Sequence, residues 1–352
     1  MNPYLVMNSQ FVIAPANEQL DSVIQEKLDN KTKPLGSLGQ LENLALKIAR
    51  IQETLSPVIS KPHCFVFAGD HGLTQQGISA FPQEVTAQMV LNFTASGAAI
   101  NVLCQQHGIA FNVVNAGVAT DLPKHPLLLD HCVKKGTENS YTGSAMSQNE
   151  LDEASNSGAE LISNKGESNT FIFGEMGIGN TASASLIMHL LTDVPLDACI
   201  GRGTGLDDEG LKQKLAILAH VAERHKEHAG NPLEVLRCVG GLEIVMMCGA
   251  MLACGEQKKL FLVDGFIATA AVLVASKITP NILDYCVFSH LSDEQGHRLM
   301  LEHLNATPLL QLSMRLGEGS GAATAFPLLQ SAVALLNQMA SFDSANVSTS
   351  NV

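Results

Sequence analysis

The chain has 352 residues, 46% hydrophobic and 16% charged, which suits one large domain plus a smaller one, or two moderate domains. Its net charge of −13 and thinly spread basic residues argue against nucleic-acid binding. None of the eight cysteines forms a Cys-x-x-Cys pair, so neither a zinc site nor a disulfide framework is signalled. The first basic residue is Lys27, and the longest uncharged apolar run, 266–275, is too short to span a bilayer. We therefore expect a cytoplasmic protein without membrane contact.

The N-terminal part of the chain has helical periodicity. Residues 1–30 are predicted to form a helical arm, and a second helix is predicted from about Leu38 to Thr54. Ser37 and Gln40 have the spacing of a capping box at the start of this second helix.

From residue 63 onward, short β-rich segments alternate with helical ones. Six segments are predicted as strands: Cys64–Ala68, Phe111–Asn115, Thr170–Phe173, Ala198–Ile200, Leu260–Val263 and Tyr285–Phe288. This alternation predicts an α/β fold with a mainly parallel six-stranded sheet that has helices on both faces. Ligands of such sheets bind at the carboxyl ends of the strands, and the unusual polar clusters of this chain follow those ends. We therefore expect a binding site there.

Further helices are predicted in the second half of the chain. Ser147 and Glu150 form a capping box after a polar stretch at about 130–150. Another helix is predicted after Ser292, with Gln295 at the capping-box position. Residues 300–340 are predicted to be helical around a glycine-rich loop, and the polar tail from residue 341 to be frayed.

The glycine-rich loop Leu316–Ala323 is the first candidate site. It holds Glu318 among three glycines, which permit close backbone approach or a positive φ. A desolvated carboxylate there would have a raised pKa and could act as a general base. A flexible turn with an exposed glutamate is the alternative. No serine or cysteine lies in a nucleophile elbow, which argues against covalent acyl chemistry.

Two other glycine-rich segments follow predicted strands. Segment 174–181 could bind an anion or ribose at a helix N-terminus, or could be a tight turn whose Asn180 or Thr181 caps the helix. Segment 201–205 precedes a helix with Lys212 and Lys214, and could cradle a phosphate, although lysines on helices are usually only solvated.

Several acidic and aromatic side chains lie near the same strand ends. Asp70, Glu175 and Asp264 could hold Mg²⁺ or ribose hydroxyls, and ribose binding or structural support is favoured because no diphosphate-dependent transferase signature is present. His71 and His290 are expected to be hydrogen-bonded residues at strand ends. Residues with a structural alternative are Ser292, as an N-cap, and Phe81, as a packing residue.

Taken together, these motifs resemble those of the nicotinate-nucleotide–dimethylbenzimidazole phosphoribosyltransferase family. The matching segments occur in family order over about 33–323: 33–39, 68–72, 174–181, 201–205, 264–266, 289–290 and 316–323. Each segment is weak alone, but seven in order are specific. The resemblance implies transfer of the 5-phosphoribosyl group of nicotinate mononucleotide to 5,6-dimethylbenzimidazole, without metal or cofactor, giving α-ribazole 5′-phosphate and nicotinate.

The resemblance also implies residue roles. Glu318 would be the catalytic base. The implied substrate-binding residues are Phe81, Gln88, Glu175, Gly177, Gly203, Lys214, Asp264, Ser292 and Leu316. Among these, Phe81 and Leu316 would line the pocket for the aromatic base. Phe81 replaces the serine of some members, which changes the shape and polarity of that pocket.

For the fold, the resemblance implies a Rossmann-like sheet in a large domain, 59–303, and a small helical domain built from 1–58 and 304–352. It further implies a homodimer with the site near the subunit interface. Two alternatives remain: an NAD(P)-dependent oxidoreductase, against which the missing G-x-G-x-x-G pattern counts, and a non-catalytic nucleotide-binding regulatory module.

Overall fold

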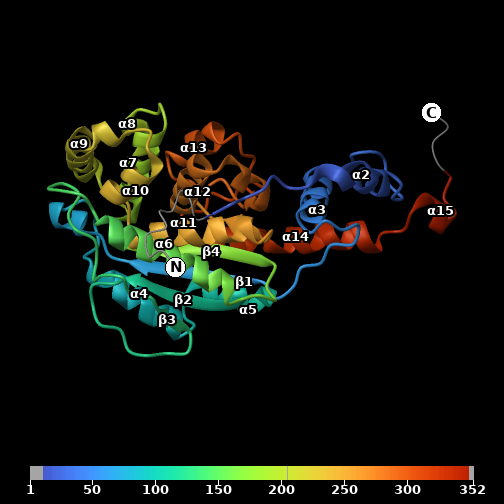
Figure 1. The fold of residues 1–352 in the computed structure, drawn as a ribbon, viewed down its shortest axis with the longest axis horizontal. Helices are drawn as coiled ribbons and strands as arrows, with labels where there is room; N and C mark the ends of the chain where they lie inside the picture. The colour runs from blue at the N-terminus through green and yellow to red at the C-terminus, as the bar shows by residue number, and fades with distance from the viewer. Residues whose placement is uncertain (1–10, 204, 349–352) are drawn as a thin grey trace.

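The computed structural model describes residues 11–203 and 205–348 and is built around one parallel sheet (Figure 1). The spatial order of its strands is β3-β2-β1-β4-β5-β6, with every neighbouring pair parallel. The strands are β1 (His63–Gly69), β2 (Ala110–Gly117), β3 (Leu128–Asp130), β4 (Thr170–Met176), β5 (Leu260–Val263) and β6 (Cys286–Phe288). The order reverses direction between β1 and β4, so this is a doubly wound sheet with its switch point there.

The helices connect and cover these strands. Four α-helices outside the layers described below are α7 (Asn180–Leu191), α9 (Asp208–Arg224), α10 (Pro232–Val239) and α13 (His297–His303). The 3₁₀ helices are η1 (Glu18–Leu20), η2 (Gly72–Gln76), η3 (Lys226–His228) and η4 (Pro280–Tyr285).

Five of the six predicted strands coincide with observed ones, but Ala198–Ile200 was wrong. Residues up to Cys199 belong to a short helix, α8 (Leu196–Cys199), in which the Pro195 carbonyl accepts the N–H groups of residues 198 and 199. Cys199 and Ile200 are buried, which explains the apolar run, and so short a run has no periodicity that separates helix from strand. The sixth strand, β3, was missed because it is a three-residue edge strand.

Helices cover both faces of the sheet, as Figure 1 shows. On one side, α6 (Gln148–Ser163) packs on α11 (Leu242–Glu256), and α11 and α12 (Phe266–Ile278) contact β4 and β5. On the other side, α4 (Glu84–Thr94) contacts β1, β2 and β4, and α5 (Ala99–His107) contacts β2. The central strands are therefore apolar on both sides.

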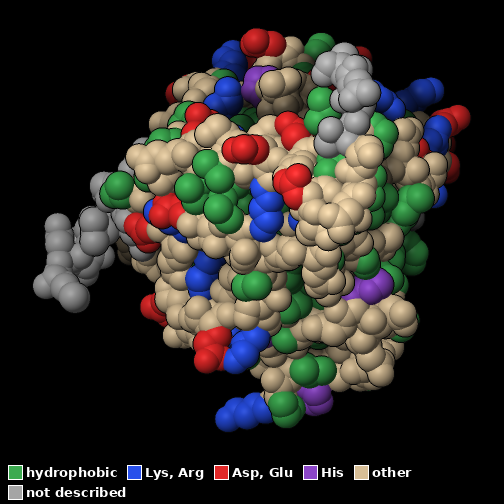
Figure 2. All heavy atoms as spheres, turned by 90° about the vertical axis from the view of Figure 1, so that its right-hand side faces the viewer, with side chains coloured by type: hydrophobic (Ala, Val, Ile, Leu, Met, Phe, Trp, Pro, Cys, Tyr) green, Lys and Arg blue, Asp and Glu red, His purple; other side chains and the backbone are tan. Residues whose placement is uncertain are grey.

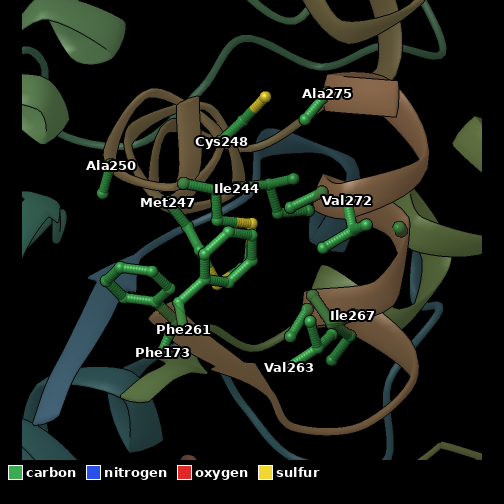
Figure 3. Close-up of a cluster of buried hydrophobic side chains, with 14 of the residues drawn as sticks. Phe173, Ile244, Met247, Cys248, Ala250, Phe261, Val263, Ile267, Val272 and Ala275 are labelled. Atoms are coloured by element: carbon green, nitrogen blue, oxygen red, sulfur yellow. The ribbon is translucent and has the colours of Figure 1, made fainter. Parts of the chain in front are cut away.

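The core between the sheet and α11 and α12 is aromatic and aliphatic (Figure 3). Phe173 of β4 and Phe261 of β5 lie beside Met247 of α11, with Ile267 of α12 close by. Every residue of α11 from 242 to 255 is buried, as expected for a helix that is apolar on all sides.

The terminal helices extend away from the sheet (Figure 1). They are α2 (Asp21–Asp29), α3 (Gln40–Ile51), α14 (Ser320–Gln338) and α15 (Phe342–Ala345). Helix α3 packs along α14, which also contacts α5, β4 and β5. The division into 59–303 and a small domain from both ends stays a prediction. The N-terminal third of the predicted arm, 1–10, lies outside the described residues, as does 349–352.

One predicted capping box is confirmed, and two predicted helix starts were wrong. The Ser147 hydroxyl and the Glu150 carboxylate each accept the other's backbone N–H at the start of α6. By contrast, α3 starts at Gly39, whose φ is +54°, without a side-chain cap. The helix expected after Ser292 begins only at residue 297, because the Ser292 N–H is held by the His297 ring. The stretch 304–319 is irregular rather than helical.

Two observations concern contact with membranes and nucleic acids: one is the apolar stretch 84–107, and the other is the distribution of charged side chains on one face. By length and composition alone, the 24-residue stretch 84–107 could cross a membrane, but it consists of α4 and α5 separated by a turn, and both helices pack on the sheet. Figure 2 views the end of the molecule where α2 and α3 lie, and basic and acidic side chains are mixed there.

Candidate active site

A cavity of about 520 Å³ opens at the carboxyl ends of β4 and β5, beside the switch point of the sheet. It is lined by residues from segments far apart in the sequence: Phe81, Glu175–Ile178, Asn180, Thr181, Gly203, Gly265–Ile267, Ser292, Glu294 and Arg315–Glu318. A larger cavity of about 680 Å³ near α7 and α9 contains none of the predicted site residues.

The cavity brings together seven of the ten predicted site residues. These are Phe81, Glu175, Gly177, Gly203, Ser292, Leu316 and Glu318. Lys214 reaches its edge, because the ammonium group donates to Thr181 Oγ1 and to the Gly201 carbonyl, each at 3.3 Å. Gln88 is exposed on α4 and does not line the cavity, and Asp264 lies behind its wall.

The Glu318 loop has an unusual backbone conformation. Gly317, Glu318 and Gly319 have φ angles of +80°, +63° and +83°, a region that is costly for a non-glycine residue. The loop also lies directly against the end of β4, since a Cβ on Gly174 would overlap the Glu318 carbonyl carbon. The glycines therefore serve both purposes expected of them, close approach and positive φ.

Asp264 holds this loop in place from behind. Its two carboxylate oxygens accept the backbone N–H groups of Gly319, at 3.1 Å, and Ala322, at 2.9 Å, at the start of α14. A carboxylate at a helix N-terminus satisfies donors that lack partners within the helix. Asp264 is only 2% exposed and supports the loop, and its predicted contact with substrate stays a prediction.

The carboxyl groups of the site hold protons unusually well. Burial, and then the charge of Asp264, raise the pKa of Glu318 to about 7. Burial, together with the carboxylates of Asp264, Glu243 and Glu318, raises the pKa of Glu175 well above its usual range. Glu318 can therefore accept a proton near neutral pH, whereas burial favours the neutral form of Glu175, which in that form can donate a hydrogen bond.

The opposite end of the cavity is basic. Lys214 is almost fully buried, and burial lowers its pKa to about 8, against the opposing charge of Glu294. Gly203 has a φ of +52° and lies beside the lysine, while Thr204 is outside the described residues. Arg315 also lines this cavity. Backbone N–H groups of glycines, a hydroxyl and an ammonium group are suited to a phosphate.

Glu294 and Arg315 were not predicted from the sequence. Arg315 directly precedes Leu316, so its position next to the glycine-rich loop could have identified it as a cavity residue from the sequence. Glu294 lies two residues after Ser292, and burial raises the pKa of its carboxyl group. No sequence pattern distinguished Glu294 from a solvated acid.

Of the two histidines predicted to be hydrogen-bonded at strand ends, His71 was predicted correctly and His290 was not: the buried Nδ1 of His290 has no hydrogen-bond partner among the described residues, and its Nε2 lies 3.9 Å from the nearest Asp264 oxygen. His71 is buried between the Glu243 carboxylate, 2.7 Å from Nε2, and the Ser183 hydroxyl, 3.0 Å from Nδ1, which confirms its prediction as a hydrogen-bonded residue. Asp70 accepts the Ala119 N–H and does not line the cavity. The three acids proposed together for Mg²⁺ or ribose therefore separate, and only Glu175 faces the cavity.

The mouth of the cavity is apolar. Phe81 and Leu316 line it and are 50% and 55% exposed. An opening of this kind suits a flat aromatic ligand next to Glu318.

A doubly wound sheet with a phosphate-type pocket and a carboxylate base at its switch point defines an α/β enzyme acting on a nucleotide-sized substrate. The sequence matches the model of a family described as phosphoribosyltransferase over residues 13–347. The chain belongs to this phosphoribosyltransferase family.

Known proteins similar to the chain agree with this assignment. A protein of Ralstonia nicotianae named nicotinate-nucleotide–dimethylbenzimidazole phosphoribosyltransferase is 52% identical over 340 residues, 96% of each chain. A protein of Photobacterium profundum with the same name is 48% identical over 339 residues, 96% of this chain and 99% of the other. The crystal structure of CobT from Thermus thermophilus has a TM-score of 0.90 and 40% identity, covering 94% of this chain and 100% of that one.

Proposed function

We propose that the protein transfers the 5-phosphoribosyl group of nicotinate mononucleotide to 5,6-dimethylbenzimidazole, giving α-ribazole 5′-phosphate and nicotinate. The observation that carries the proposal is Glu318, a buried carboxyl group with a pKa of about 7 at the wall of a cavity with a basic end. The relatives' names identify the substrates with which to test it.

In this mechanism, Glu318 takes the proton from the ring N–H of the benzimidazole. The other ring nitrogen then forms a bond to C1′ of the ribose while the C1′–nicotinate bond breaks. The electron pair of the broken bond neutralises the pyridinium nitrogen, so the leaving group departs as nicotinate. Direct displacement inverts C1′ from β to α. Proton removal by a positioned base typically contributes about 10²–10⁴-fold in rate.

The remaining residues position the nucleotide. Lys214, Thr181 and the glycine-rich turn at Gly203 are the proposed phosphate site, because they form the basic end of the cavity. Protonated Glu175 is proposed to donate to a ribose hydroxyl. Phe81 and Leu316 are proposed to hold the aromatic base over Glu318.

We also propose a cytoplasmic homodimer that binds neither nucleic acid nor membrane. The exposed apolar mouth at Phe81 and Leu316 supports a second copy covering it. All eight cysteines are free, which fits a reducing compartment. Light scattering of the purified protein tests the dimer, and a mass equal to one chain would contradict it.

The test of the function is incubation with nicotinate mononucleotide and 5,6-dimethylbenzimidazole, with nicotinate and the α-nucleotide quantified by chromatography. Nicotinate should appear only when the base is present. We expect Glu318→Gln to lower the rate about 10²–10⁴-fold with the fold retained, because glutamine has the same size but takes no proton. Folded wild-type protein without turnover would refute the proposal, and near-normal turnover of the variant would refute Glu318 as the base.

A further inference from the structure

We propose that His225, His228 and Cys238 form a binding site for one zinc ion, outside the cavity described above. Within the part of the chain that the structure describes, these three residues offer ligand atoms that all lie within 4.8 Å of one another. Neutral imidazole and thiolate are the ligands that zinc prefers, in contrast to the oxygen ligands preferred by magnesium.

The local fold explains why the two histidines meet. His225 ends α9, and η3 follows it directly, with the His228 N–H donating to the His225 carbonyl at 3.0 Å. Side chains three residues apart lie on the same side of a 3₁₀ turn. The ring centroids are accordingly 6.4 Å apart. A Cys-x-x-Cys search does not find this His-x-x-His pair.

Cys238 comes to the same place from α10. The 140s loop is tied to the end of this helix, since the Ala145 N–H donates to the Cys238 carbonyl at 2.9 Å and the Ser144 hydroxyl lies 3.5 Å from the sulfur. A hydroxyl next to a ligand sulfur is the kind of outer partner that orients a metal ligand. Three separate segments thus converge on the cluster.

The hydrogen bond of the buried His225 ring indicates which of its nitrogens would bind the metal. The Nε2 of His225 lies 3.0 Å from the Ser140 carbonyl, so in the neutral ring Nε2–H donates to that oxygen, and zinc would bind through Nδ1. Zinc would displace the proton of the Cys238 thiol, as metals do when they bind cysteine.

The partial exposure of His228 gives a metal ion a path into the cluster. The His228 side chain is 27% exposed, and the Glu234 carboxylate lies 3.7 Å from its Nδ1. Tetrahedral zinc requires neighbouring ligand atoms at about 3.4 Å. The cluster therefore needs a closure by side-chain rotation, with water as the fourth ligand, because the Glu234 oxygen near His228 already accepts from Arg237 Nη2 at 2.7 Å.

Such an ion would act at a distance from the chemistry. Helix α9 begins near the basic end of the cavity, carries Lys214, and ends at the cluster. Zinc would fasten the far end of this helix to α10 and to the 140s loop. Figure 1 shows α9 and α10 in the group of helices at one end of the sheet.

The test uses the full-length protein, stripped with a chelator and reloaded with Zn²⁺ or Mg²⁺. Bound metal is measured by mass spectrometry and affinity by competition with a chromophoric chelator. We expect one tightly bound zinc per chain, no magnesium, and a higher unfolding temperature with zinc. Cys238→Ser and His228→Gln should weaken zinc binding by about 100-fold or more, since loss of an outer partner alone can cost that much.

Matched controls are Cys132→Ser and His107→Gln, at half-buried positions outside the cluster, which should bind like the wild type. Cobalt loading adds a direct readout: a thiolate-to-cobalt charge-transfer band that is absent in Cys238→Ser. If that variant does not fold, His228→Gln, at a partly exposed position, decides. The proposal fails if the wild type binds less than one zinc per chain, or if the cluster variants bind zinc as tightly as the controls.

Discussion

Replacing Glu318 with glutamine should make the protein more stable at alkaline pH. Burial raises the pKa of this carboxyl group from 4.5 to about 7 in the folded chain, whereas the unfolded chain has the ordinary value. Between these values the folded state binds more protons than the unfolded state, so the free energy of unfolding falls as pH rises. The difference corresponds to about 3 kcal/mol that is lost by about pH 8.

Glutamine resembles the protonated acid, so the variant escapes this loss. We expect Glu318→Gln to match the wild type near pH 4.5 and to exceed it by about 3 kcal/mol near pH 8. Urea unfolding of ligand-free protein across this range measures the difference. Glu302→Gln, at an exposed position, is the control and should show no such trend. A Glu318→Gln stability gain that is absent at pH 8, or equal at both pH values, would refute the reasoning.

Three further predictions concern activity. The kcat/KM should rise with pH through about 7, because Glu318 loses its proton there. It should fall above about 8, because Lys214 loses its charge. A flat profile would exclude both groups as the source of the pH dependence. Asp264→Asn removes a charge that raises the pKa of Glu318, so the acid limb of the pH profile should move to lower pH, and an unmoved limb would leave burial as the sole cause. The maximal rate should also fall, because asparagine keeps only one of the two acceptor oxygens that hold the loop. Gly174→Ala should displace the Glu318 loop and lower kcat/KM about 100-fold. The control Gly166→Ala, where a Cβ meets nothing within 4 Å, should keep the wild-type value. Equal kcat/KM values for the two variants would contradict the close packing of Gly174 on the loop.

The parallel sheet was predictable because its central strands are apolar on both sides and are followed by turns. The errors fall on its shortest elements. Residues 198–200 and β3 each span too few residues for periodicity to decide, and tertiary pairing alone makes β3 a strand.

The site was predictable where its residues are contiguous in sequence. The glycines around Glu318 indicated both a positive φ and a close approach, and the structure shows both. The role of Asp264 could not be read in the same way, because its partner Gly319 is 55 residues away in the chain. How the pKa of Glu318 is set depends on that same long-range contact, and on burial.

The helix that starts at the Glu318 loop is also the longest helix in the described part of the chain. Helix α14 has 19 residues, or about 28 Å at about 1.5 Å per residue, and packs along α3 as well as on the sheet. Pro327 interrupts its hydrogen bonding, which gives it one defined point at which to bend. Because α14 starts at the Glu318 loop, we expect substitutions in α3 to alter the position of the base without touching the cavity.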